Sequence, residues 1–141
     1  MTTESVCLCG TNRISFAGEP LTKFRCHCVD ERRLTGNGFS NNLLMPTDNP
    51  TVLRGTLKTN ARKAGSGNTI TTHFCGECGS LLYRTSDGYP GTMVIKAGCI
   101  DDDGRTNAEY VPDVEIFTRS RVPWMKPVEG ARQEIADFTE F

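Results

Sequence analysis

The cysteines of this chain fall into closely spaced pairs, a pattern typical of metal ligands and of reactive thiols. Cys7 and Cys9 form a C-x-C pair, and Cys75 and Cys78 form a C-x-x-C pair within the segment FCGECGS. Zinc takes four ligands in a tetrahedron with Zn–S distances of about 2.3 Å, and cysteines one or two residues apart can supply neighbouring ligands. We therefore expect these four cysteines to form a closed structural zinc site that joins the N-terminal segment to the middle of the chain.

The number of cysteines favours ligands over disulfides. The chain has seven of them, an odd number, and its opening segment MTTESVCLCG has neither the basic nor the apolar part of a secretory signal. A chain without a secretory signal is expected to stay inside the cell, where thiols remain reduced. The alternative for Cys75 and Cys78 is a redox pair, but no βαβ pattern surrounds them as a thioredoxin-like motif would require.

A second C-x-C pair, Cys26 and Cys28, lies in the segment RCHCVDERRLTG and is followed by Glu31. Strand geometry places the two sulfurs on one face and His27 on the other. A helix that begins just after Cys28 could bring Glu31 back to the same point. Two cysteines and one carboxylate would leave a fourth zinc position open for water or substrate, as in catalytic zinc sites.

Three alternatives stay open for Cys26, Cys28 and Glu31. In the first, they hold a second zinc ion. In the second, they hold no metal, and Glu31 acts as a general acid or base beside a cysteine thiol. In the third, the site is inactive: the cysteines are buried as small apolar residues, and Glu31 is a solvated carboxylate at the start of a helix.

Other polar residues could contribute to such a site. Cys99 has no closely spaced partner and is expected either as a buried residue at a strand end or as a reactive thiol near the second site. His27 and His73 are the two histidines, and each should face away from the cysteine beside it. Basic side chains that could hold a substrate carboxylate, or simply form a solvated surface, are Arg32, Arg33, Arg54, Lys58, Arg62 and Lys63.

The elements that must position these residues are predicted to be short strands. Gly and Pro interrupt the chain at irregular intervals, and the segments between them are rich in β-branched and aromatic residues. One helix of one or two turns is expected over residues 29–36, and residues 129–138 form either a short terminal helix or a frayed end. The expected strands lie within residues 5–9, 13–18, 21–27, 39–45, 51–59, 68–74, 80–85, 92–98 and 113–120.

Length and composition indicate one domain that spans residues 1–141 and is mainly β, built of small antiparallel sheets. Charged residues make up 23% of the chain and the net charge is -1, so neither nucleic acid nor a membrane surface is indicated as a partner. The apolar runs are far shorter than the roughly 20 residues that a membrane-spanning helix needs. These features predict a cytoplasmic protein.

Four segments taken together resemble a known family. CLCG, CHCVDERRLTG, THFCGECGSLLY and KAGCIDDD resemble, in this order, the motifs of the glutathione-dependent formaldehyde-activating enzyme family, which also includes centromere protein V. The resemblance runs from about Cys7 to Trp124. It implies a β-tent fold, a structural zinc on the first four cysteines named above, and a second, catalytic zinc on a C-x-C-x-x-C motif. Two positions of that motif are Cys26 and Cys28, whereas the third falls on Glu31 instead of cysteine.

The resemblance also implies an activity, the condensation of formaldehyde with glutathione to S-(hydroxymethyl)glutathione, classed as a carbon–sulfur lyase in the reverse direction. Zinc suits this chemistry because it lowers the pKa of a bound thiol and polarises a carbonyl group. Since Glu31 departs from the motif, we expect a lyase-like enzyme for a small thiol adduct or carbonyl metabolite, with glutathione or another thiol as partner, or one repurposed for a different tailoring reaction. The alternative is a non-catalytic zinc-stapled binding module. The lack of a long basic or disordered extension favours the enzyme.

Overall fold

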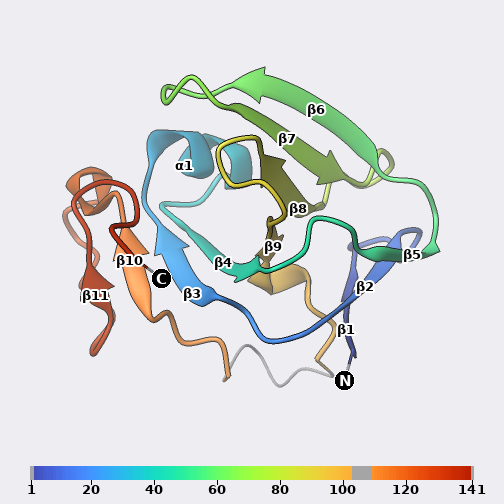
Figure 1. The fold of residues 1–141 in the computed structure, drawn as a ribbon, viewed down its shortest axis with the longest axis horizontal. Coiled ribbons are helices and arrows are strands. Elements are labelled where there is room, and N and C mark those ends of the chain that lie inside the picture. Colours follow the sequence, from blue (N-terminus) through green and yellow to red (C-terminus); the bar gives the residue numbers. More distant parts are fainter. Residues whose placement is uncertain (1, 103–108, 141) are drawn as a thin grey trace.

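The computed structural model describes residues 2–102 and 109–140, which form two β-sheets and one α-helix (Figure 1). The smaller sheet has the order β1-β2-β5, with β1 at Thr2–Val6, β2 at Arg13–Ala17 and β5 at Thr51–Arg54. The larger sheet has the order β11-β10-β3-β4-β9-β8-β7-β6. Its strands and the two 3-10 turns are, in chain order, β3 (Thr22–Cys26), β4 (Ser40–Met45), β6 (Lys58–Lys63), β7 (Thr69–Phe74), β8 (Leu81–Ser86), β9 (Met93–Lys96), η1 (Ala97–Cys99), β10 (Val114–Ile116), η2 (Thr118–Ser120) and β11 (Arg132–Gln133).

Most neighbouring strands pair antiparallel, so the prediction of a mainly β fold is confirmed. One end of the larger sheet differs, because β10 lies parallel to both β3 and β11. Parallel neighbours need a long connection, and residues 117–131 separate β10 from its parallel neighbour β11. This arrangement places Ile116 beside Cys26 at the end of β3, and so brings the C-terminal part of the chain to the second cysteine pair.

Helix α1 (Val29–Thr35) confirms the one helix that was predicted with defined ends. At its N-terminus the Cys28 sulfur accepts a hydrogen bond from the Glu31 N–H at 3.4 Å. At its C-terminus Gly36 has φ 70°, and its N–H donates to the Arg32 carbonyl at 2.9 Å. Glycine adopts this left-handed conformation without a steric penalty, which is why it ends the helix.

Of the two alternatives expected for residues 129–138, a short helix or a frayed end, the helix is wrong. The segment contains the two-residue strand β11 and otherwise irregular backbone. Glu134 N–H donates to the Glu115 carbonyl at 2.9 Å, and Phe117 N–H donates to the Ala136 carbonyl at 2.8 Å. These bonds between segments use the backbone groups that a helix would pair internally.

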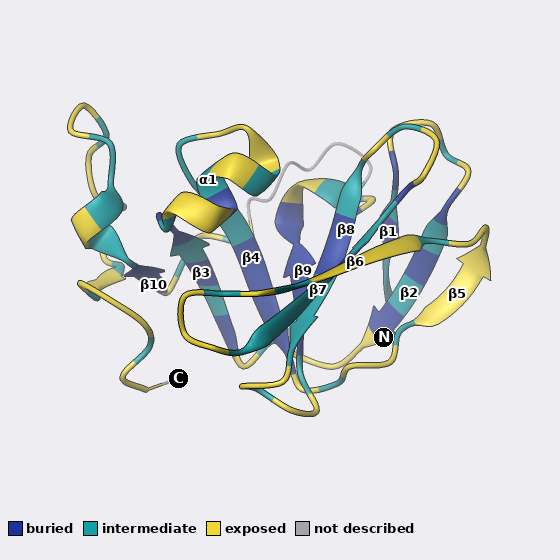
Figure 2. Cartoon of the chain, turned by 90° about the horizontal axis from the view of Figure 1, so that it is seen from above, coloured by how far each residue is buried: buried dark blue, intermediate teal, exposed yellow. Residues whose placement is uncertain are grey.

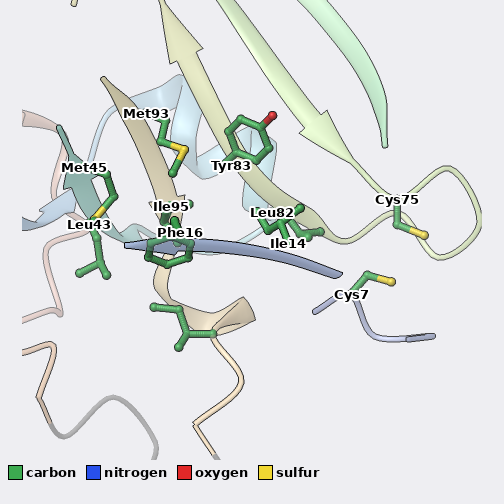
Figure 3. Close-up of a cluster of buried hydrophobic side chains, with 11 residues drawn as sticks. Cys7, Ile14, Phe16, Leu43, Met45, Cys75, Leu82, Tyr83, Met93 and Ile95 are labelled. Carbon is green, nitrogen blue, oxygen red and sulfur yellow. The ribbon is translucent and has the colours of Figure 1, made fainter. Parts of the chain in front are cut away.

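The buried side chains form two clusters on opposite faces of β4, as the alternation of side chains along a strand requires. Leu43 and Met45 point into the first cluster, which joins the two sheets (Figure 3). Leu44 points into the second cluster. Figure 2 shows the burial concentrated in β3, β4 and β9, whereas β5 and β6 are largely exposed. The second cluster comprises Phe24, Cys26, Leu44, Val94, Val114 and Ile116.

Candidate functional site

The four cysteines predicted to bind structural zinc converge on one point. The sulfurs of Cys7 and Cys9 lie 3.6 Å apart, and those of Cys9 and Cys75 lie 3.7 Å apart. With Cys78, the four sulfurs all lie within 4.8 Å of one another. A tetrahedron with Zn–S bonds of about 2.3 Å has sulfurs about 3.8 Å apart, so this cysteine quartet could hold a metal ion of that size.

Turns, and not strands, position the quartet. Cys7 and Cys9 follow the end of β1, and Cys75 and Cys78 lie in the turn between β7 and β8. Gly79 has φ 81° and closes that turn by donating its N–H to the Cys75 carbonyl at 2.8 Å. The strand expected over residues 5–9 therefore stops short of the first cysteine, because the chain must turn there to bring both sulfurs to one side.

Hydrogen-bond donors surround the quartet sulfurs, as thiolate ligands require. The N–H groups of Glu77 and Cys78 lie 3.4 Å from the Cys75 sulfur, and the bond from Cys78 in particular lowers the pKa of Cys75. The Ser80 hydroxyl lies 3.2 Å from the Cys78 sulfur and lowers the pKa of Cys78 to about 5. Thiolates are the form that binds metal, and four of them favour a soft ion over a hard one.

The second cysteine pair lies at the junction of β3 and α1. Cys26 is the last residue of β3 and is buried, whereas Cys28 precedes α1 and is half-buried. The Cys26 thiol donates to the Cys28 sulfur at 3.4 Å. Glu31 lies in the first turn of α1 and is 3% exposed. The three residues singled out from the sequence therefore lie close together, at the junction of β3 and α1.

The Glu31 carboxylate is fully engaged by two cations. Its Oε1 accepts from Arg84 Nε at 2.6 Å, and its Oε2 accepts from Lys96 Nζ at 2.5 Å. Lys96 also donates to Asn42 Oδ1 at 3.1 Å. Burial alone would raise the pKa of Glu31, but the charges of Lys96 and Arg84 outweigh burial and hold the pKa at about 2. Glu31 is therefore ionised at neutral pH and has no proton to give.

These contacts bear on the predicted second zinc site. Among the described residues, the quartet is the one place where three or more His, Cys, Asp or Glu side chains converge on one point. Cys26, Cys28 and Glu31 do not form such a group. A metal ion bound by Glu31 would also have to approach the Lys96 ammonium and the Arg84 guanidinium, whose positive charges repel it. The donor set around Cys26, Cys28 and Glu31 does not fit a metal ion in this arrangement, and metal binding there stays a prediction.

The two thiols of this pair differ in their readiness to ionise. The bond from the Cys26 thiol, with a smaller contribution from the Glu31 N–H, lowers the pKa of Cys28 to about 7 in spite of burial. The pKa of Cys26 is raised, because Cys26 is the donor in that bond and is desolvated. Cys28 is therefore the thiol that can carry negative charge near neutral pH.

Cys28 opens into a cavity of about 650 Å³. Glu31 and Arg84 line the cavity beside it, together with Arg62 from β6. Arg62 is one of the basic residues that the sequence offered for binding a substrate carboxylate. Phe24 and other residues of the second core cluster line it as well. A cavity of this size suits a small-molecule ligand, and it places an ionisable thiol between charged and apolar walls.

The remaining sequence candidates lie elsewhere. His27 points away from the cysteine sulfurs, as expected, and its Nε2 lies 2.8 Å from the buried Glu115 carboxylate. His73 stacks on Tyr83 with ring centroids 4.0 Å apart. Cys99 packs against the first core cluster, and its thiol donates to a backbone carbonyl at 3.3 Å. Cys99 is partly buried, which favours a packing role over that of a thiol beside the second cysteine pair.

Three charged residues of this region were not singled out from the sequence: Arg84, Lys96 and Glu115. Each lies within or at the end of a largely apolar segment: LLYRT, MVIK and DVEIF respectively. A charged side chain within a buried strand must find a partner, since an unpaired buried charge is strongly unfavourable. A charged residue in an apolar segment can be recognised from the sequence, whereas the residue that pairs with it cannot.

Comparisons with known proteins agree with the sequence motifs. The model of the family described as "Glutathione-dependent formaldehyde-activating enzyme" matches residues 2–120, so the chain belongs to this family. A crystal structure of a Rhodobacter sphaeroides protein superposes with a TM-score of 0.53 at 17% sequence identity, over 93% of this chain and 98% of that one, which indicates a shared fold. No curated protein matches the chain at a significant level. Within the described residues, no helix is long and apolar enough to cross a membrane.

The quartet makes a first prediction. Cys75→Ser should lower the metal content by about one ion per chain and destabilise the fold by several kcal/mol, because a structural metal contributes its binding free energy to folding. Elemental mass spectrometry and thermal unfolding measure the two effects. Cys99→Ser, which removes a thiol outside the quartet, should retain the metal, and equal metal loss in both variants would contradict the assignment.

The second cysteine pair makes a prediction about metal stoichiometry. Protein purified without chelator should contain about one metal ion per chain, because Lys96 and Arg84 already neutralise Glu31. Glu31→Cys supplies a third thiol and should raise the content toward two, whereas Glu31→Gln should not. A content of two in the unaltered chain would show instead that Glu31 leaves its cations and completes a second site.

The buried ion cluster predicts a large and non-additive effect on stability. Lys96→Met should cost about 3–5 kcal/mol of unfolding free energy, as expected when one partner of a buried ion pair is removed. Lys63→Met, at an exposed position of β6, is the matched control and should cost little. In urea unfolding, Glu31→Gln should be less costly in the Lys96→Met background than alone, and simple additivity would argue against the pairing.

Proposed function

We propose that this chain catalyses reversible formation of a carbon–sulfur bond between a thiol and a carbonyl compound, in the cavity beside Cys28. The observation that carries the proposal is the placement of the Cys28 sulfur: it lines a cavity of about 650 Å³ and accepts hydrogen bonds from the Cys26 thiol and the Glu31 N–H. Membership in a family described as glutathione-dependent and formaldehyde-activating supports this reaction class. Glutathione is therefore the first thiol to test.

In the proposed reaction the Cys28 thiolate acts as the base. It takes the proton from the substrate thiol, and the resulting substrate thiolate attacks the carbonyl carbon. The carbon–sulfur bond forms as the π-electron pair of the carbonyl moves to oxygen, and the Cys28 thiol returns the proton to that oxygen. The product is a hemithioacetal, and cleavage runs through the same steps in reverse.

The buried charges support this chemistry without a second metal ion. Arg84 lines the cavity and places positive charge where the oxygen of the adduct becomes negative. Glu31 is a positioning residue: its carboxylate holds Arg84 and Lys96, and its N–H stabilises the Cys28 thiolate. Cys26 supplies the second hydrogen bond to that thiolate.

We propose zinc as the ion of the quartet, because four thiolate ligands in a tetrahedron suit it. Cys7 and Cys9 would hold it from the N-terminal sheet, and Cys75 and Cys78 from the turn between β7 and β8. The ion would then fix one sheet to the other and take no part in the reaction. Since four thiolates and a reactive thiol need reducing conditions, we expect the protein to work in the cytoplasm.

The test is the rate of exchange between free thiol and hemithioacetal, followed by NMR with formaldehyde and glutathione and then with larger aldehydes. Cys28→Ser retains a hydrogen-bonding residue before α1 and should reduce the enzyme-dependent rate by 10²-fold or more, as expected for loss of a catalytic base. Cys99→Ser should leave it unchanged. If no aldehyde exchanges faster with protein than without it, the chain is a binding module and not an enzyme.

A further inference from the structure

The cavity beside Cys28 is far larger than the smallest carbonyl substrate requires. Formaldehyde has two non-hydrogen atoms, whereas cavities of several hundred Å³ hold drug-sized molecules, and this one measures about 650 Å³. Glu31 and Arg84 form a closed ion pair in its wall, and apolar side chains line other parts of it.

Three phenylalanines line the same cavity: Phe24, Phe117 and Phe138. Phe24 is 1% exposed and belongs to the second core cluster, against which the other two rings pack. The rings of Phe24 and Phe138 meet edge to face, with centroids 4.9 Å apart and planes at 78°. Cys28 packs against this same cluster, so the proposed catalytic sulfur borders an aromatic compartment.

The C-terminal segment Ala136–Phe138 forms part of this compartment, although the family model matches only residues 2–120. Specific contacts hold the segment in place. The Ala136 carbonyl accepts from Phe117 N–H at 2.8 Å, and the Tyr89 hydroxyl donates to Asp137 Oδ2 at 2.9 Å. The segment is therefore a built wall of the cavity, anchored at the two residues that precede Phe138.

A buried carboxylate anchors the chain that leads to this wall. One Glu115 oxygen accepts from Val128 N–H at 2.8 Å and from Gln133 Nε2 at 2.7 Å, while the other faces His27. Glu115 is fully buried in β10, beside β3. Residues 128–133 are thereby fixed to the sheet that carries Cys26, which sets where the following residues, including Phe138, can lie.

We infer that the compartment formed by Phe24, Phe117 and Phe138 binds an aromatic ring that the substrate carries next to its reacting sulfur or carbon, and that Phe138 is a specificity-determining residue. The inference rests on the reaction proposed at Cys28, since it names the substrate class of that site. Edge-to-face and offset packing among aromatic rings favours a ring over a flexible chain at such a position. Formaldehyde has no group that would occupy it.

Binding to the full-length Cys28→Ser variant tests the inference without turnover. The probes are S-benzylglutathione and S-methylglutathione, which differ only in the group on sulfur, and the same pair of thioethers of N-acetylcysteine. Calorimetry should show the benzyl compound of at least one pair binding tenfold or more tightly than its methyl counterpart, as burial of a phenyl ring predicts. Equal affinities in both pairs, or no binding by any probe, would overturn the inference.

Two further variants locate the effect. Phe138→Ala in the Cys28→Ser background should reduce the benzyl preference to about twofold or less. Ile135→Ala removes a side chain of the same segment that is 71% exposed and should keep the preference. A preference that survives Phe138→Ala would overturn the role of this residue. Absence of thiol–carbonyl exchange in the unaltered protein, with the benzyl preference intact, would instead refute the reaction and leave the aromatic compartment standing.

Discussion

The arrangement around the second cysteine pair depends on one constraint: a carboxylate buried beneath helix α1 must be neutralised. Glu31 is 3% exposed, and Lys96 and Arg84 neutralise it from two different strands, β9 and β8. The bond from Lys96 to Asn42 extends the network to β4. A cluster of this kind costs desolvation energy that its hydrogen bonds and charges offset only in one geometry. It therefore fixes the position of α1 on the sheet, and with it the position of Cys28.

The two cysteine sites differ in what surrounds them. The quartet lies in turns at the edge of the first core cluster, where backbone N–H groups reach its sulfurs and support negative charge. Cys26 and Cys28 instead lie against an apolar cluster, where fixed side-chain cations lie nearby. The same residue type thus serves as a candidate metal ligand in one place and as a candidate reactive thiol in the other, and the surroundings make the difference.

The sequence predicted the features that depend on residues close together along the chain. The spacing within each cysteine pair of the quartet, the Gly36 end of α1 and most of the β-rich segments depend on neighbours within a few residues and agree with the structure. The single strand expected over residues 51–59 is wrong, because the structure divides this segment between β5 and β6, which belong to different sheets. The partners of Glu31 could not be predicted, because Arg84 and Lys96 reach it only through the register of β8, β9 and β4. The parallel entry of β10 and the path of residues 129–138 likewise depend on pairing between distant segments.

Segments far apart in the chain line the cavity. The sulfur that would react comes from the β3–α1 junction, whereas part of the aromatic wall comes from residues 136–138. Tyr89 holds Asp137 in this wall, and Glu115 anchors Val128 and Gln133 in the chain that leads to it. A change in the wall therefore need not disturb the thiols, the ion cluster or the quartet. Related chains could diverge in what they accept by altering their final residues alone, while the chemistry at the centre stays constant.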